Sequence, residues 1–137
     1  MSIPVWMRKE TAQRAGHRCE YCQLSQAGQE AAFHIDHIHP FVAGGESELE
    51  NLALACVSCS LRKGARRRAR DPLGKTTVGL FHPRQQAWDH HFRWKLNRVR
   101  GITPTGRATV DLLKMNRALI IEIRAEERLM GRHPPAA

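Results

Sequence analysis

The sequence lacks any long hydrophobic run. No stretch of its 137 residues approaches the ~20 apolar residues that a membrane-spanning helix needs, so we expect no membrane partner. The opening segment MSIPVWMRKE also lacks the apolar core of a secretion signal. The sequence therefore predicts a cytoplasmic protein, and its length suits a single domain over residues 1–137 with a modest core.

Acidic residues are scarce. The chain has 13 aspartates and glutamates against 22 lysines and arginines, a formal charge of +9 and an isoelectric point near 10.3. Such a balance favours a polyanionic partner, because neutralising phosphates releases counterions and drives binding. Charge alone fits a basic protein with no nucleic-acid role equally well, and it specifies no chemistry.

Cysteines are also few, but their spacing is regular. All four fall in two Cys-x-x-Cys pairs, Cys19 with Cys22 and Cys56 with Cys59. In a cytosolic chain such pairs are better explained as metal ligands than as disulfides, although two disulfides remain the alternative. Four thiolates at this spacing suit one tetrahedral Zn²⁺, and a closed site of this kind is structural.

The chain has no internal repeat and no low-complexity linker. Hydrophobic pattern and turn residues predict short strands and helices in alternation. The expected elements are a helix at 4–15, antiparallel strands at 33–38 and 51–56, a helix at 60–70, a turn at 71–74, a short strand near 78–83, a hairpin around Asn97 and helices at 105–115 and 117–130. Val5, Met7, Ala12, Val110, Leu113, Ile120, Ile121 and Leu129 are the expected packing residues of the helices. Residues 131–137 are expected to be disordered.

The run HIDHIHP, residues 34–40, lies between the cysteine pairs. Asp36 can offer a hard carboxylate oxygen to Mg²⁺, Mn²⁺ or a similar ion. His37 titrates near neutrality and can accept a proton from water, while a metal ion would hold a scissile phosphate. Neighbouring strand residues face opposite ways, so this interpretation requires a strand end or bulge, which the nearby Pro40 favours.

Three further residues near this run have polar side chains. His34 shares the strand face of Asp36, and is either an auxiliary ligand or orienting group, or an ordinary surface residue. His39 is most simply a polar residue entering a loop. Asn51 follows the Gly44-Gly45 turn, where its amide can hydrogen-bond backbone groups across the loop and hold the segment of His37 in place.

Together these features resemble the HNH endonucleases. The resemblance rests on the pattern C-x-x-C, D-H-I-x-P, G-G and N-L-x-L-x-C-x-x-C followed by K-G, over roughly residues 17–64. It implies an α+β fold with a ββα-metal (His-Me finger) core at residues 17–70. A structural zinc knot, the N-terminal helix and a C-terminal extension at 71–130, with its hairpin and helices packed on the core, would complete the domain.

The resemblance also implies residue roles. Asp36 would bind the catalytic metal, Mg²⁺ or Mn²⁺/Ni²⁺, His37 would be the general base, and Asn51 the middle residue of the motif. The four cysteines would hold the structural zinc. The family usually places His or Asn directly after the last cysteine, whereas this chain has Ser60, a weaker and shorter ligand. A non-catalytic, zinc-stabilised nucleic-acid-binding module of the same fold is therefore the alternative.

A basic run follows the second cysteine pair. It contains Arg62, Lys63, Arg66, Arg67, Arg68 and Arg70 and no acidic residue. On the helix of a ββα unit these side chains would contact DNA phosphates without reading bases, so we expect low sequence specificity; a merely solvated face is the alternative. Trp88, Phe92 and Trp94 either stack on bases or belong to the core. The sequence indicates no oligomeric state.

Overall fold

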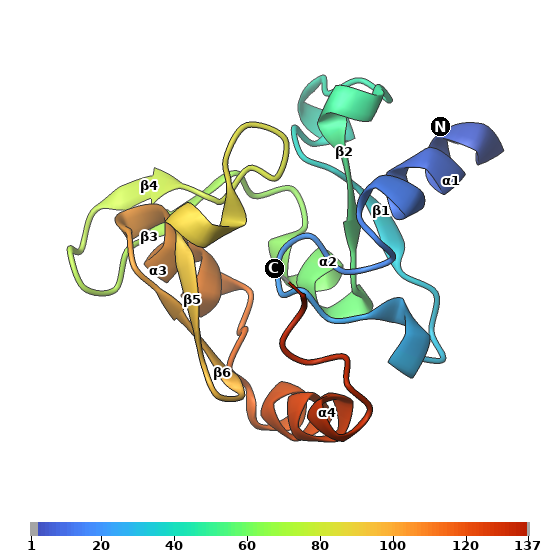
Figure 1. Cartoon of the computed structure of the whole chain (residues 1–137). Helices are drawn as coiled ribbons and strands as arrows, with labels where there is room; N and C mark the ends of the chain where they lie inside the picture. Colours follow the sequence, from blue (N-terminus) through green and yellow to red (C-terminus); the bar gives the residue numbers. More distant parts are fainter. Residues whose placement is uncertain (1–2, 137) are drawn as a thin grey trace. The chain divides into compact units, whose positions relative to one another are not determined.

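The computed structural model describes residues 3–136, and its elements are those of an α+β chain (Figure 1). Two compact units make up this part of the chain. The first comprises the chain up to Arg67 together with His82–Gln85, and the second comprises Arg68–Phe81 and the chain from Gln86 onward. No helix within residues 3–136 has both the length and the apolar character needed to cross a membrane.

The first unit contains one antiparallel strand pair and two helices. Its elements are α1 (Val5–Arg14), β1 (His34–His37), β2 (Leu52–Ala55) and α2 (Val57–Lys63), with the 3-10 turns Gln26–Gly28, Phe41–Ala43 and Leu49–Asn51. In the register of the pair, His34 lies opposite Ala55 and His37 opposite Leu52. The two strands and the first helix are confirmed at the places that the sequence predicted.

The two strands differ in burial. Every residue of β2 is buried, whereas in β1 only Asp36 is. The small and branched side chains of Leu-Ala-Leu-Ala thus form the centre of the unit, and β1 brings a carboxylate against it. β1, β2 and α2 follow one another along the chain and contact each other, which is a ββα arrangement.

The helix predicted at 60–70 is wrong in both bounds. α2 begins after Cys56, whose sulfur caps it by accepting a hydrogen bond from the Cys59 amide, and it ends at Lys63. Gly64 follows with a φ of 53°, a conformation that glycine adopts without steric cost. Arg68–Arg70 then forms strand β3 instead.

Polar contacts fix α1 more than its apolar side chains do. Val5, predicted to pack, is 67% exposed. Thr11 is buried, and its hydroxyl donates to the Met7 carbonyl. The Arg14 guanidinium donates to the carbonyls of Leu49, at 2.9 Å, and Leu52, at 2.7 Å. Arg14 therefore ties the end of α1 to the entry of β2.

The second unit consists of two hairpins and two helices. Its elements are β3 (Arg68–Arg70), β4 (Thr77–Gly79), the 3-10 turn Trp88–His90, β5 (Phe92–Lys95), β6 (Arg98–Gly101), α3 (Pro104–Leu112) and α4 (Ala118–Leu129). The predicted hairpin around Asn97 and both C-terminal helices are confirmed. α3 packs against β6, β3 and β4. A Cβ on Gly101 would lie 2.3 Å from the Arg107 nitrogen, so this close approach requires a glycine.

Aromatic rings fill the second unit. Phe92 is fully buried, and its ring centroid lies 4.8 Å from that of Trp88 and 5.3 Å from that of Phe81. The Trp94 ring lies against Trp88 and carries the Arg124 guanidinium 5.2 Å from its centroid. These aromatics therefore serve packing, which was the second of the two interpretations drawn from the sequence.

The C-terminal residues depart from expectation in two places. Leu129, predicted to pack, is 86% exposed. His133, within the tail 131–137 predicted to be disordered, is buried and its imidazole hydrogen-bonds the Leu96 carbonyl at 3.0 Å. Ala137, the last residue of that tail, lies outside the described residues.

Candidate functional site

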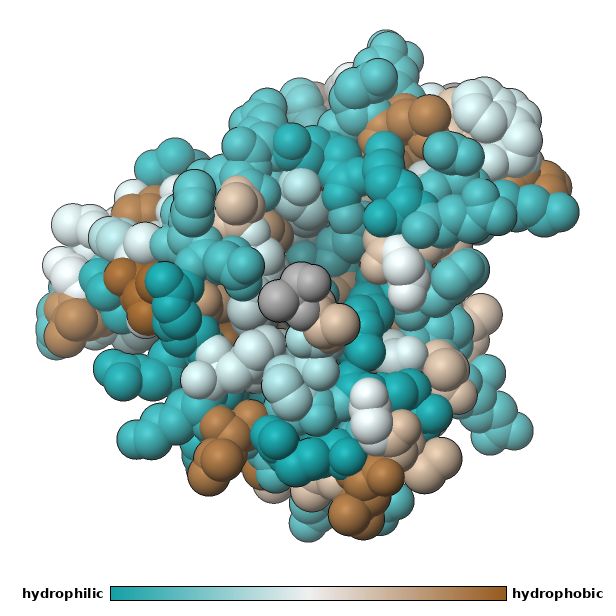
Figure 2. All heavy atoms as spheres, viewed as in Figure 1, coloured by the Kyte–Doolittle hydropathy of each residue, from teal (hydrophilic) through white to brown (hydrophobic). Residues whose placement is uncertain are grey.

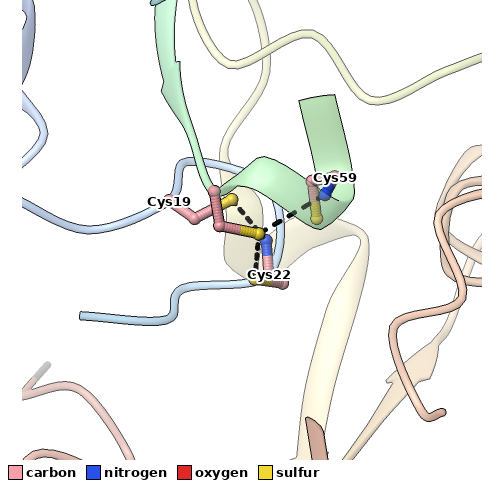
Figure 3. A group of neighbouring side chains, drawn as sticks. Cys19, Cys22 and Cys59 are labelled. Carbon is pink, nitrogen blue, oxygen red and sulfur yellow. Dashed lines mark hydrogen bonds between the residues drawn. The ribbon is translucent and has the colours of Figure 1, made fainter. Parts of the chain in front are cut away.

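Four cysteines meet in the first unit. All are buried, and their sulfur atoms lie within 4.8 Å of one another. The two pairs have matching local geometry, because the Cys22 amide donates to the Cys19 sulfur and the Cys59 amide to the Cys56 sulfur, each at 3.4 Å. Cys19, Cys22 and Cys59 are labelled in Figure 3, where their sulfur atoms gather at the start of α2.

This cluster fits a tetrahedral zinc ion. Zn–S bonds of ~2.3 Å place tetrahedral sulfurs about 3.8 Å apart, and the Cys22 and Cys56 sulfurs are 3.7 Å apart. Hydrogen bonds from the other thiols, Cys19 first among them, lower the pKa of Cys56 far below its ordinary value, so the cluster stabilises a thiolate. The four residues are therefore placed to bind a metal ion, and no disulfide links them.

A pocket of about 700 Å³ opens beside β1. It brings together four of the candidate site residues, which lie on β1 and α2. Its lining includes Arg8, His34, Asp36, His37 and Ser60. Because β1 ends at His37, both Asp36 and His37 line this pocket although they are neighbours on a strand.

Asp36 is the buried anion of the pocket, at 8% exposure. Its Oδ2 accepts a 2.8 Å hydrogen bond from the Tyr21 hydroxyl, and the Lys63 ammonium lies 3.3 Å from Oδ1. Burial raises the pKa of Asp36 above its ordinary value, while Lys63 and Tyr21 oppose that rise. Each carboxylate oxygen has two acceptor positions, so Asp36 keeps capacity for a further cation.

His37 is half-buried, and its Nε2 lies 2.9 Å from the Ser47 hydroxyl. The Phe41 ring lies 6.0 Å away, centroid to centroid. Burial lowers the pKa of His37 below its ordinary value; the Asp36 carboxylate raises it in part, and the Lys63 ammonium lowers it further. Burial therefore favours the neutral imidazole, which is the form that can accept a proton.

Ser60 pairs with a histidine across the pocket. Its hydroxyl lies 2.8 Å from Nδ1 of His34. His34 is exposed, so its position on the strand does not by itself mark it as a site residue. His34 therefore contacts the one side chain that departs from the family pattern.

Asn51 closes the loop between the strands. Its amide oxygen accepts from the His39 amide at 2.7 Å, and its amide nitrogen donates to the carbonyls of His39, at 3.0 Å, and Glu46, at 2.8 Å. Gly45 completes the closure, since a Cβ there would lie only 1.8 Å from the His39 oxygen. Asn51 therefore contacts the loop backbone that follows His37.

The residues of the basic run divide between the two units. Arg62, Arg66, Arg67, Arg68 and Arg70 are exposed. Lys63 is the exception and corrects the prediction of phosphate contact, because it is 2% exposed and its ammonium also donates to the His37 carbonyl at 3.3 Å. Arg68 and Arg70 belong to β3 in the second unit and not to the helix.

The sequence did not predict the position of three residues of the site. Tyr21 lies between Cys19 and Cys22, and the sequence pattern assigned it no role. Lys63 was predicted to contact DNA phosphates with the rest of the basic run. Arg8 of α1 reaches the same pocket from a distant part of the sequence. Its place directly before Gly64 is the one signal in the sequence that could have distinguished Lys63 from the neighbouring arginines.

One of three comparisons with known proteins gave a match. A protein-family model described as HNH endonuclease matches residues 19–66, from the first cysteine of the cluster to just beyond α2. No match was found among curated proteins or among solved structures. An HNH domain indicates a nuclease-type or nucleic-acid-related function, and the family's nucleases act on DNA. Residues 19–66 of this chain therefore match the HNH endonuclease domain.

Proposed function

We propose that the chain is a metal-dependent endonuclease that hydrolyses phosphodiester bonds in DNA. One observation carries the proposal: the buried carboxylate of Asp36 and the imidazole of His37 line the same pocket. Hydrolysis of a phosphodiester needs a group that accepts a proton and a group that binds a cation, and His37 and Asp36 would supply them.

The donors of the pocket suit a hard cation. Asp36 would hold the catalytic ion, Mg²⁺ or Mn²⁺/Ni²⁺, through a carboxylate oxygen, with the Ser60 hydroxyl as a second, weaker ligand. His34 keeps that hydroxyl oriented. Once bound, the ion would polarise the scissile phosphate and neutralise charge on the leaving oxygen.

The protein's own residues handle the proton and the substrate. The His37 imidazole takes a proton from the attacking water, the water oxygen forms a bond to phosphorus, and the bond from phosphorus to the leaving oxygen breaks. Ser47 orients the imidazole, and Asn51 holds the loop on which it depends. Arg8, at the rim of the pocket, supplies positive charge for the substrate phosphate.

Substrate binding and the structural metal complete the proposal. The exposed arginines Arg62, Arg66 and Arg67 would contact the DNA backbone next to the scissile bond, with little dependence on base sequence. Zn²⁺ in the Cys19, Cys22, Cys56 and Cys59 cluster would fix the start of α2 against the segment that holds the first cysteine pair.

A nicking assay on supercoiled plasmid tests the proposal. Wild type is expected to convert the plasmid to the open circle with Mg²⁺, Mn²⁺ or Ni²⁺, and His37→Ala to lose at least ~100-fold in rate, the lower range for a general base. His90→Ala, at an exposed histidine outside the pocket, is the matched control and should nick like wild type. Absence of nicking by wild type with all three ions, or equal nicking by His37→Ala, contradicts the proposal.

One contact favours a second candidate, a DNA-binding module without catalysis. The Lys63 ammonium already balances Asp36 from 3.2 Å, which is where charge balance by a metal ion would otherwise be needed. The two functions differ in the effect of Ser60→Asn, which restores the usual ligand of the family. An endonuclease should gain Mn²⁺ affinity and nicking rate, whereas the module should bind DNA equally well with either residue and nick with neither.

A further inference from the structure

The β5–β6 hairpin of the second unit carries basic residues in facing pairs. In its antiparallel register Arg93 lies opposite Arg100, and Lys95 lies opposite Arg98. All four side chains are exposed. Since side chains alternate between the faces of a strand, the four share one face of the ribbon, which we call the cationic face.

The opposite face of the same ribbon is buried. Phe92 is 0% and Val99 1% exposed, and Trp94 packs against Trp88. Packing therefore fixes which way the hairpin faces, and the cationic face points away from the core of its unit. Figure 2, which draws one side of the molecule, shows how hydrophilic side chains dominate a surface of this chain.

Packing does not explain this arrangement of charge. Like charges directly opposite each other destabilise a strand pair, whereas opposite charges would stabilise it. No acidic residue occurs between His90 and Val110. Within residues 3–136, Lys95, Arg98 and Arg100 form no ion pair. The hairpin thus keeps an electrostatic cost that a bound polyanion would offset.

We propose that the cationic face binds the phosphate backbone of duplex DNA, as a second contact surface outside the HNH domain. Basic residues two positions apart on a strand are separated by about 6.8 Å, the axial rise of two nucleotides on one DNA strand. The choice of DNA rests on the proposed function of the first unit. Contacts to phosphate position a duplex and carry no base specificity.

Fluorescence anisotropy on a 30-base-pair duplex tests this surface, with the full chain in a His37→Ala background so that no cleavage occurs. The test variant is Lys95→Gln, Arg98→Gln and Arg100→Gln together; Arg93 is kept because its guanidinium donates to the carbonyls of Asp89 and Phe92. We expect affinity to fall roughly tenfold or more, and the slope of log K against log salt to shrink by about 0.9 per lost contact.

The matched control removes three exposed lysines elsewhere, Lys9→Gln, Lys75→Gln and Lys114→Gln, and should change both quantities much less. The proposal is overturned if both variants lose DNA affinity equally or if neither loses any. It is also overturned if the test variant no longer binds anionic phospholipid vesicles but still binds DNA. If the test variant does not fold, the charge-preserving variant Lys95→Arg, Arg98→Lys and Arg100→Lys should bind like wild type, and single Gln substitutions should each reduce the slope.

Binding and nicking are read separately, so the two proposals can fail separately. Loss of DNA affinity in the test variant supports the cationic face even if wild type nicks no plasmid. Conversely, a nicking wild type whose test variant binds with unchanged affinity and unchanged slope retains the endonuclease proposal and removes the cationic face.

Discussion

The Lys63 ammonium lies 3.2 Å from Oδ2 of Asp36 and 3.3 Å from Oδ1. Both side chains are buried, at 2% and 7% exposure. The pair links the last residue of α2 to the strand that carries the candidate catalytic residues. Lys63 therefore holds the helix and the carboxylate in one arrangement, and any cation that binds Asp36 does so next to an existing positive charge.

Removing one partner of this pair should destabilise the protein strongly. Lys63→Met leaves a buried carboxylate without its cation, and we expect the free energy of unfolding to fall by about 3–5 kcal/mol. The double variant Lys63→Met with Asp36→Asn should recover part of that loss, because it removes both charges. Urea unfolding of the wild type, both single variants and the double variant measures the coupling; additive losses contradict the paired arrangement.

The cysteine cluster should bind one zinc ion per chain and make folding depend on it. Cys19→Ser removes one of four buried ligands, so we expect it to lose zinc and to melt at a lower temperature. Metal analysis by mass spectrometry and circular dichroism melts check this. Chelation of wild type should reproduce the lower Tm, and added zinc should reverse it; a wild type that purifies without metal and melts unchanged in chelator is incompatible with this assignment.

Asn51 should act through the loop backbone. Asn51→Ala loses three hydrogen bonds to residues 39 and 46 and should lower the free energy of unfolding by about 1–3 kcal/mol. Asn51→Asp keeps the acceptor for the His39 amide and loses the two donated bonds, so its loss should be intermediate. Hydrogen exchange of the His39 amide should quicken in Asn51→Ala and stay slower in Asn51→Asp. Equal exchange in both variants would separate Asn51 from the loop.

Asp71 predicts how stability depends on pH in the second unit. Arg107 donates to both its carboxylate oxygens, at 2.9 and 2.8 Å. These bonds, with backbone amides, lower its pKa to about 2. Because the folded pKa lies below the ordinary value, the stabilisation is fully present above pH ~4 and is lost as the pH falls toward 2.

Melting temperatures between pH 7 and pH 2 test that dependence. Asp71→Asn should melt lower than wild type at pH 7, and the difference should shrink as the pH falls through this range. Asp111→Asn, at an exposed aspartate of α3, is the control and should follow the wild-type curve. A difference between Asp71→Asn and wild type that stays constant with pH contradicts the role of the ion pair.

The local pattern of the sequence was enough to predict strands β1 and β2, the β5–β6 hairpin and the metal cluster. Cys-x-x-Cys spacing restricts the ligand geometry, and the apolar run Leu52–Ala55 indicates a buried strand whatever its surroundings. Lys63 could not be predicted in the same way. Its burial depends on the angle at which α2 crosses β1, and in the sequence it is one of six neighbouring cations.

Two other differences have the same origin in tertiary contacts. The composition of residues 65–70 favours a helix, but Gly64 turns the chain and pairing of Arg68 with Gly79 makes a strand. In the sequence Ser60 looks like a lost ligand, whereas in the structure its hydroxyl contacts the His34 imidazole. By contrast, basic and apolar residues alternate along Phe92–Lys95 and Arg98–Gly101, and this alternation predicts the cationic face. The total charge of the chain does not indicate it.

Rescue of a cavity variant by free imidazole tests the central claim, proton transfer by His37, most directly. In this measurement His37→Gly, with its zinc content verified, is incubated with supercoiled plasmid and Mn²⁺ over a range of imidazole concentrations. We predict that wild type nicks without imidazole and that His37→Gly alone is inactive. Added imidazole should restore part of the nicking rate of His37→Gly, in proportion to the concentration of neutral imidazole. Nicking by His37→Gly at the wild-type rate, or an inactive wild type, would contradict the account.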